Sequence, residues 1–264
     1  MAAVALVVTL VVVLGTAFRV GPFGAQPAAA ITDPEEILAS ALQALLDAES
    51  VHLSVELEGA LPGGLVGADR DIGLAGDTVE AALDIAAVRS VILIDAGGAA
   101  GPELELRTAF DRAWHRSGTG PWASIAVSDV FDVGAVDLNP LTLVERVRAY
   151  LEERPDARIS RGSDVPCVGG VCRVVTYEAG PDPLGLAAAI LPAERAGHLP
   201  DGDVTLTVQA ERTTLRPVVA FLEMRDPDGL LIAAAAIRFR DWNDPVPFDE
   251  PSPPAEAAQP VDGG

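Results

Sequence analysis

An apolar residue at every second position is the feature that most constrains how this chain can fold. Between positions 51 and 58, apolar and polar residues alternate without a break. Because successive side chains of a β-strand point to opposite faces, this pattern predicts a strand with one apolar face and one wet face. The alternation returns between positions 204 and 209. The apolar positions of the two segments are Val51, Leu53, Val55, Leu57, Val204, Leu206 and Val208.

Three segments have the pattern of a helix. The first follows Asp33, which can cap it, and Pro34, which suits a first turn. A second is expected to begin at Asn139-Pro140, and a short apolar third lies between Asp182 and Pro192. Because the third has no polar face, we expect it either to be deeply buried or to cover an apolar cavity.

The remaining strands are predicted to be antiparallel. Shorter ones are expected near positions 78–86, 90–95 and 103–109, followed by a hairpin that carries Trp114 and Trp122. The final third has three strands joined by turns near positions 213–214 and 226–229. This order indicates an α+β fold, with one large antiparallel sheet and helices gathered on one face, and not a βαβ series.

The two cysteines, Cys167 and Cys172, are expected to form a disulfide across a hairpin. Gly169-Gly170 lies between them and supplies the turn that would bring the two strands into bonding range. Disulfides persist outside the cytoplasm. The alternative is a metal site, but two thiols without a nearby His or second Cys pair are half of a zinc site.

An apolar run without charge, residues 2–18, precedes the predicted domain. Its length suits either a signal-peptide core or a short membrane anchor, so residues 1–30 are expected to be one of the two. No basic residue stands between Met1 and the run. Either the true start is upstream or Arg19 is the orienting charge, and we favour the first because the positive-inside rule would otherwise leave the domain in the cytoplasm.

We therefore expect one extracytoplasmic domain over residues 31–250 and a proline-rich disordered tail over residues 251–264. The chain has 39 acidic and 18 basic residues, with a net charge of -21. Nucleic acid is therefore not an expected partner, and attraction to anionic headgroups is disfavoured. No recognisable motif combines a nucleophile, a base and an orienting group, so we expect a protein that is not an enzyme and has no cofactor.

Both ends of the predicted domain resemble the LolA-like lipoprotein-carrier superfamily, and especially its LppX/LprG-like branch. The start of the domain is a helix that runs straight into a strand, ILASALQALLDAESVHLSVELEG. Its end is FRDWNDPVPFDEP, with an Asp-aromatic-Asn-x-Pro-Val pattern and a proline exit. Trp114 and Trp122 match the aromatic-turn-Trp hairpin of the branch. The chain differs in one respect, because it lacks the cysteine that is lipidated in LppX-like proteins.

This resemblance implies a curved antiparallel sheet, an unclosed β-barrel, whose concave face is covered by helices and holds lipid or lipoprotein acyl chains. The seven alternating apolar positions named above would then be candidates for the cavity wall. The implied function is extracytoplasmic binding, extending to carriage, of these chains. One alternative is an envelope stress sensor that binds an anti-sigma factor or another protein partner. A second is a scaffold in which the apolar faces pack into a closed core.

Overall fold

The computed structural model describes residues 30–61, 72–73, 76–95, 104–109, 112–126, 158–178 and 202–251. This part of the chain contains one α-helix and thirteen strands. The helix is α2 (Pro34–Leu46), and the strands are β1 (Ser50–Leu61), β2 (Ile72–Gly73), β3 (Thr78–Asp84), β4 (Arg89–Asp95), β5 (Leu104–Ala109), β6 (Arg112–Ser117), β7 (Ala123–Ala126), β8 (Arg158–Arg161), β9 (Val165–Cys167), β10 (Gly170–Glu178), β11 (Asp203–Glu211), β12 (Pro217–Arg225) and β13 (Leu231–Arg240).

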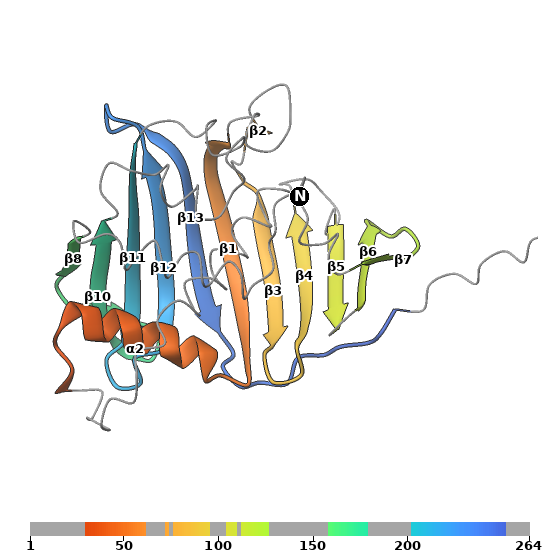
Figure 1. The fold of residues 1–264 in the computed structure, drawn as a ribbon, viewed down its shortest axis with the longest axis horizontal. Coiled ribbons are helices and arrows are strands. Elements are labelled where there is room, and N and C mark those ends of the chain that lie inside the picture. The colour runs from red at the N-terminus through yellow and green to blue at the C-terminus, as the bar shows by residue number, and fades with distance from the viewer. Residues whose placement is uncertain are drawn as a thin grey trace, which may run out of the picture.

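All the strands belong to one antiparallel sheet. Its order is β7-β6-β5-β4-β3-β1-β13-β12-β11-β10-β8, with β2 beside β1 and β9 beside β10 (Figure 1). Because β7 and β8 lie at opposite ends of this order, the described sheet does not close into a barrel. The predicted fold class, a large, curved and unclosed antiparallel sheet, is confirmed. The turns predicted near positions 213–214 and 226–229 join the last three strands.

Helix α2 begins where the sequence predicts. The Asp33 side chain accepts hydrogen bonds from the backbone N–H groups of Glu35, at 2.9 Å, and Glu36, at 3.1 Å. These bonds satisfy two of the donors that a helix leaves free at its N-terminus. Ile37, Leu38, Ala41 and Leu45 are buried on one side of the helix. That side packs on β8, β10, β11 and β12, across which α2 runs in Figure 1.

The centre of the sheet joins the two ends of the described chain, because β1 pairs with β13 along its length. Gly59 makes this pairing possible near the upper end of β1. A Cβ atom at position 59 would lie 2.1 Å from the carbonyl oxygen of Ile232, and the backbone there has a φ of +90°. Only glycine accommodates both conditions without a local rearrangement.

The turn after β13 fixes the junction between α2 and β1. The Asn243 side-chain oxygen accepts a hydrogen bond from the N–H of Glu49 at 2.8 Å, and the N–H of Asn243 donates to the carbonyl of Ser50 at 2.9 Å. Trp242 stacks on Phe239, with ring centroids 6.2 Å apart. The Asp-Trp-Asn segment of the sequence therefore attaches the end of β13 to the start of β1.

The other two predicted helices, the leader and residues 252–264 lie outside the described residues. Among the described residues, no helix is long and apolar enough to cross a membrane.

Candidate functional site

The candidate site is one face of the sheet, which we call the apolar face. The seven predicted cavity-wall residues all lie on it, with exposures of 1–3% on β1 and 4–7% on β11. The strand register shows that they share this face, because Leu57 is paired with Ala235, Ala235 with Leu222, and Leu222 with Leu206. The sequence therefore identified two separate strips of one continuous surface.

A row of apolar residues crosses this face from β5 to β10 without interruption. Each member is the direct cross-strand partner of the next, so the side chains stand side by side on the same face. The row consists of Leu104, Ile94, Val79, Val55, Ile237, Ala220, Val208 and Val175. It spans eight adjacent strands.

Burial along this face is uneven. The central residues are buried, whereas Ile94 and Leu104 on one side and Leu222 and Met224 on the other are half-buried. Sequence reasoning missed these four residues, although they are among the members of the face that a ligand could still contact. The signal that could have found them is weak, because β4 reads as a continuous apolar run and β12 has no regular alternation.

One residue of β10 on the apolar face is a buried cation. Arg173 is 2% exposed and pairs across the strands with Ala210. Burial lowers the pKa of Arg173 below its ordinary value, and the positive charge of nearby Arg161 acts in the same direction. Arg173 and its neighbour on this face, Tyr177, both have interaction partners.

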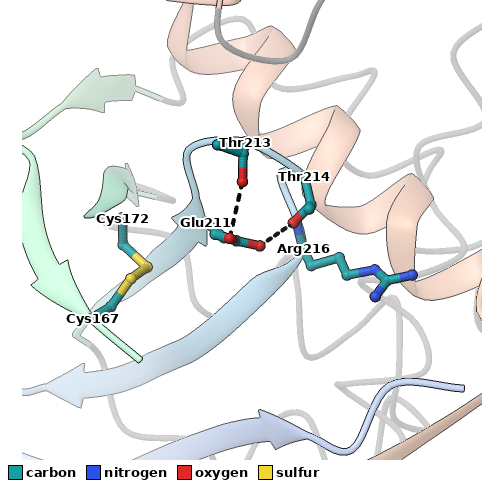
Figure 2. The surroundings of a disulfide bond; sticks show 6 residues. All are labelled: Cys167, Cys172, Glu211, Thr213, Thr214 and Arg216. Atoms are coloured by element: carbon teal, nitrogen blue, oxygen red, sulfur yellow. Dashed lines mark hydrogen bonds between the residues drawn. A yellow bond between two sulfur atoms is a disulfide. The ribbon is translucent and has the colours of Figure 1, made fainter. Parts of the chain in front are cut away.

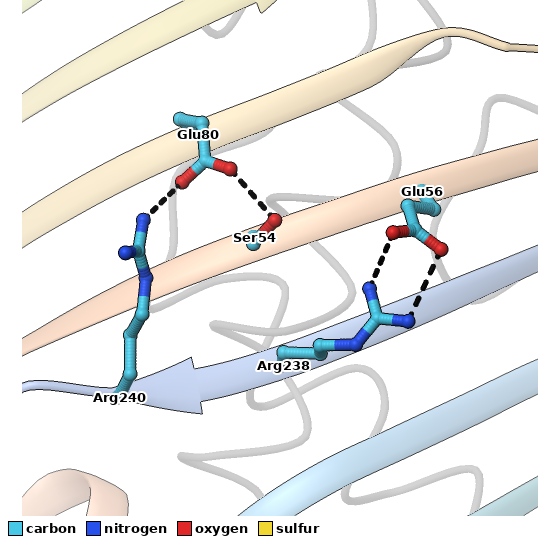
Figure 3. A network of polar contacts seen from close by, with 5 residues as sticks. All are labelled: Ser54, Glu56, Glu80, Arg238 and Arg240. Carbon is cyan, nitrogen blue, oxygen red and sulfur yellow. Dashed lines mark hydrogen bonds and ion pairs between the residues drawn. The ribbon is translucent and has the colours of Figure 1, made fainter.

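The opposite side of the sheet, which we call the polar face, is held by ion pairs (Figure 3). Glu80 accepts a hydrogen bond from Ser54 at 2.7 Å and pairs with Arg240 at 2.6 Å. Glu56 binds Arg238 through both carboxylate oxygens, at 2.5 and 3.2 Å. The hydrogen bonds from Arg238 lower the pKa of Glu56. These exposed cross-strand pairs indicate that the centre of the polar face is solvated.

A second polar cluster lies on the same face, over β5 and β6. Glu105 is 4% exposed and accepts hydrogen bonds from Nε of Arg107, at 2.9 Å, and Nε of Arg116, at 2.8 Å. Both guanidinium groups lie over the Trp122 ring, 5.0 and 4.7 Å from its centroid. The buried carboxylate is therefore fully paired, which a charge in that position requires.

The segment that follows β13 runs along the lower edge of the sheet toward this cluster (Figure 1). We call residues 245–251 the strap. Its contacts with the polar face are the Phe248 ring under Arg89 at 5.5 Å, the Asp249 carbonyl with Nη1 of Arg107, and the Glu250 carboxylate with both terminal nitrogens of Arg112. The sequence predicted an extended exit here but not its docking on β4–β6.

The predicted disulfide is present at the hairpin between β9 and β10 (Figure 2). The Cα atoms of Cys167 and Cys172 are 5.7 Å apart, and Gly169 has the positive φ of +94° that the turn needs. The neighbouring turn is held by Glu211, whose carboxylate accepts the hydroxyls of Thr213 and Thr214. Within the described ranges, no three His, Cys, Asp or Glu residues are placed to hold a metal ion.

The described residues form an open antiparallel sheet with a helix across its apolar face, and this fold is similar to that of LolA-like proteins. The solved structure of the Mycobacterium tuberculosis lipoprotein LppX is similar to this chain with a TM-score of 0.52 and 13% identity, over 83% of this chain and 100% of LppX. The resemblance found in the sequence is therefore confirmed at the level of the fold.

Two further structures are similar at lower TM-scores. MucB, solved in complex with MucA(peri), has a TM-score of 0.36 and 12% identity over 79% of this chain and 56% of MucB. A DUF1329 family protein from Desulfovibrio piger has a TM-score of 0.30 and 9% identity over 83% of this chain and 96% of its own. Neither value supports an argument about this chain. No protein-family model and no curated protein sequence matches the chain.

Proposed function

We propose that this protein binds lipid or lipoprotein acyl chains outside the cytoplasm, on the apolar face of its sheet. The observation that carries the proposal is the uninterrupted apolar row across eight strands. An acyl chain laid on such a surface gains about 0.8 kcal/mol for each buried methylene. About ten methylenes would contribute roughly 8 kcal/mol before ordering costs, so no charged anchor is needed.

The uneven burial of the apolar face supports the same proposal. The described helix α2 packs on the β8–β12 side of the sheet, whereas β3–β5 continue the apolar row on the other side. Half-buried Ile94 and Leu104 lie in that region. We place the acyl chain over β3–β5 and across the central strands, where it would cover side chains that are still half accessible.

The disulfide supports an oxidising compartment, and the apolar run at residues 2–18 is a means of reaching it. The proposal holds both if this run is cleaved and if it is retained as an anchor. Carriage of the bound chain between membranes is the more specific form of the proposal, and it requires that the chain be released as well as bound.

The direct test is to purify the protein from its native host, extract it with organic solvent and analyse the extract by mass spectrometry. We expect lipid at about one equivalent per protein, because the apolar face is one continuous surface. A protein that repeatedly carries no stoichiometric lipid, and that also fails to bind a fluorescent fatty-acid probe, has a closed core, and the proposal is then wrong.

Two neighbouring residues of β4 provide a matched pair of variants for the probe assay. Ile94 lies on the apolar face and Leu93 on the polar face, and both are half-buried. We expect Ile94→Ser to raise the probe Kd about tenfold, since contact with one large aliphatic side chain is lost. Leu93→Ser removes similar apolar surface from the other face and should leave the Kd unchanged. Equal effects of the two variants would contradict binding on the apolar face.

A further inference from the structure

The strap occupies a place on the polar face that has the properties of a peptide-binding site. We call Arg89, Arg107 and Arg112, the three residues that hold the strap, the arginine site. We propose that the arginine site binds an acidic, extended peptide segment of a partner protein, and that the strap occupies the site in the partner's absence. The site lies on the face opposite the acyl-binding surface, so this inference is independent of the proposed function.

The charges of this region call for an acidic occupant. On β4–β6, the residues that alternate onto the polar face include four arginines and two acidic residues, and Asp84 of β3 is the cross-strand partner of Arg89, which leaves one positive charge in surplus. The residues on β4–β6 are Arg89, Arg107, Arg112, Arg116, Glu105 and Asp95. The strap carries Asp249 and Glu250, and the Glu250 carboxylate, which contacts Arg112, balances the surplus. In a chain with a net charge of -21, such a local excess of arginine is unusual.

Two of the three arginines, Arg107 and Arg112, also have contacts that do not involve the strap. Nε and Nη2 of Arg107 are held by Glu105, and its guanidinium lies over Trp122, so Nη1 is left to donate outward. Arg112 lies over the Trp114 ring at 5.4 Å. Trp114 is 3% exposed and provides a rigid base. A site whose side chains are already ordered loses little conformational entropy when a ligand binds.

The strap, in contrast, is held by contacts that water and other ligands can replace. The side chains of Arg112 and Glu250 are 56% and 49% exposed, and exposed ion pairs of this kind contribute little. Arg107 donates to the backbone carbonyl of Asp249, which any peptide offers. The strap is therefore an exchangeable occupant of the arginine site.

These contacts also define the ligand. It is an extended segment with an aromatic residue for Arg89, a backbone carbonyl for Arg107 and a carboxylate for Arg112, in successive positions. Pro245, Pro247 and Pro251 keep the strap extended, and recognition of pre-extended proline-rich segments is a common mode of peptide binding. A partner segment of the type aromatic-acidic-acidic between prolines fits this site.

The test uses the full chain and a fluorescein-labelled peptide with the strap sequence, PVPFDEP, in a fluorescence anisotropy titration. In the wild type, the tethered strap competes with the peptide at a high effective concentration. The variant Phe248→Ala/Glu250→Ala weakens this competitor and leaves the arginine site intact. We expect the peptide Kd to fall about tenfold or more in this variant.

Controls separate recognition from non-specific charge attraction. In the strap-weakened background, Arg112→Ala should raise the Kd about two- to fivefold, as expected for the loss of an exposed ion pair. Arg212→Ala, which removes an equal charge from an exposed turn elsewhere, should leave it unchanged. A peptide with Ala, Asn and Gln in place of Phe, Asp and Glu should not bind.

The proposal is overturned if the strap-weakened variant, with near-UV circular dichroism and Tm like the wild type, binds the peptide no more tightly than the wild type does. It is also overturned if Arg112→Ala and Arg212→Ala have the same effect. A dimer in light scattering that is lost when the strap is weakened would assign the site to a second copy of this chain, and would contradict a partner protein.

Discussion

Single residues decide how the two ends of the described chain are joined. Asn243 does so in two ways, since its side-chain oxygen binds the N–H of Glu49 and its backbone adopts a φ of +63°. Asparagine tolerates the left-handed region better than residues with larger or branched side chains. This position therefore combines a hydrogen bond with a conformational requirement, and substitutions can separate the two.

We expect Asn243→Ala to lower the free energy of unfolding by about 2 kcal/mol, of which about half is the hydrogen bond and half the backbone conformation. Asn243→Gly restores the conformational freedom but not the bond, so it should cost about 1 kcal/mol relative to the wild type, less than the alanine variant. Urea unfolding of the three proteins measures both differences. Equal losses for Ala and Gly would show that the backbone conformation contributes nothing.

At the scale of elements, the sheet is reinforced at one end by a covalent link. The Cys167–Cys172 disulfide closes a short loop next to the turn of Glu211–Arg216, and the N–H of Arg212 donates to the carbonyl of Val171 at 2.9 Å. A short loop restricts the unfolded chain only modestly. The disulfide is therefore expected to stabilise this end without being needed for the fold.

The variant Cys167→Ala/Cys172→Ala should keep its circular dichroism spectrum and lose about 2 kcal/mol of unfolding free energy in urea. A reducing agent should bring the wild type to the same value and should not affect the variant. If the reducing agent does not change the urea midpoint of the wild type, the disulfide does not stabilise the protein.

The elements differ in how far the sequence could predict them. β1 and β11 were predictable because each has one wet face, which produces strict alternation, and the Asp226–Gly229 turn marked the last hairpin. The row of apolar residues across eight strands was not predictable from the sequence. Its register depends on pairing between strands that are far apart in the sequence, such as those of Glu56 and Arg238. The strap was missed because a polar, proline-rich segment reads as a tail, and its docking depends on arginines of strands far away in the sequence.

At the scale of the whole molecule, the net charge of -21 opposes compaction. Salt screens this repulsion, but it also screens the exposed ion pairs of the polar face, such as Arg238–Glu56 and Arg240–Glu80. Exposed pairs contribute little each, so the repulsion should dominate.

We therefore expect Tm to rise by about 2–5 °C when NaCl is increased from about 10 mM to about 300 mM at pH 7. Differential scanning calorimetry provides the measurement, and sodium gluconate in place of NaCl controls for specific anion binding. A Tm that falls with salt would show that the ion pairs of the polar face outweigh the repulsion.

The pairing of β1 with β13 has a consequence for when the sheet can be completed. While the chain is still being synthesised, the β3–β7 meander can already form. One edge of β1 has no hydrogen-bonding partner until β13 has been synthesised. Pairings of such long sequence separation form slowly. The polypeptide is therefore unable to complete this sheet before β13 has been synthesised.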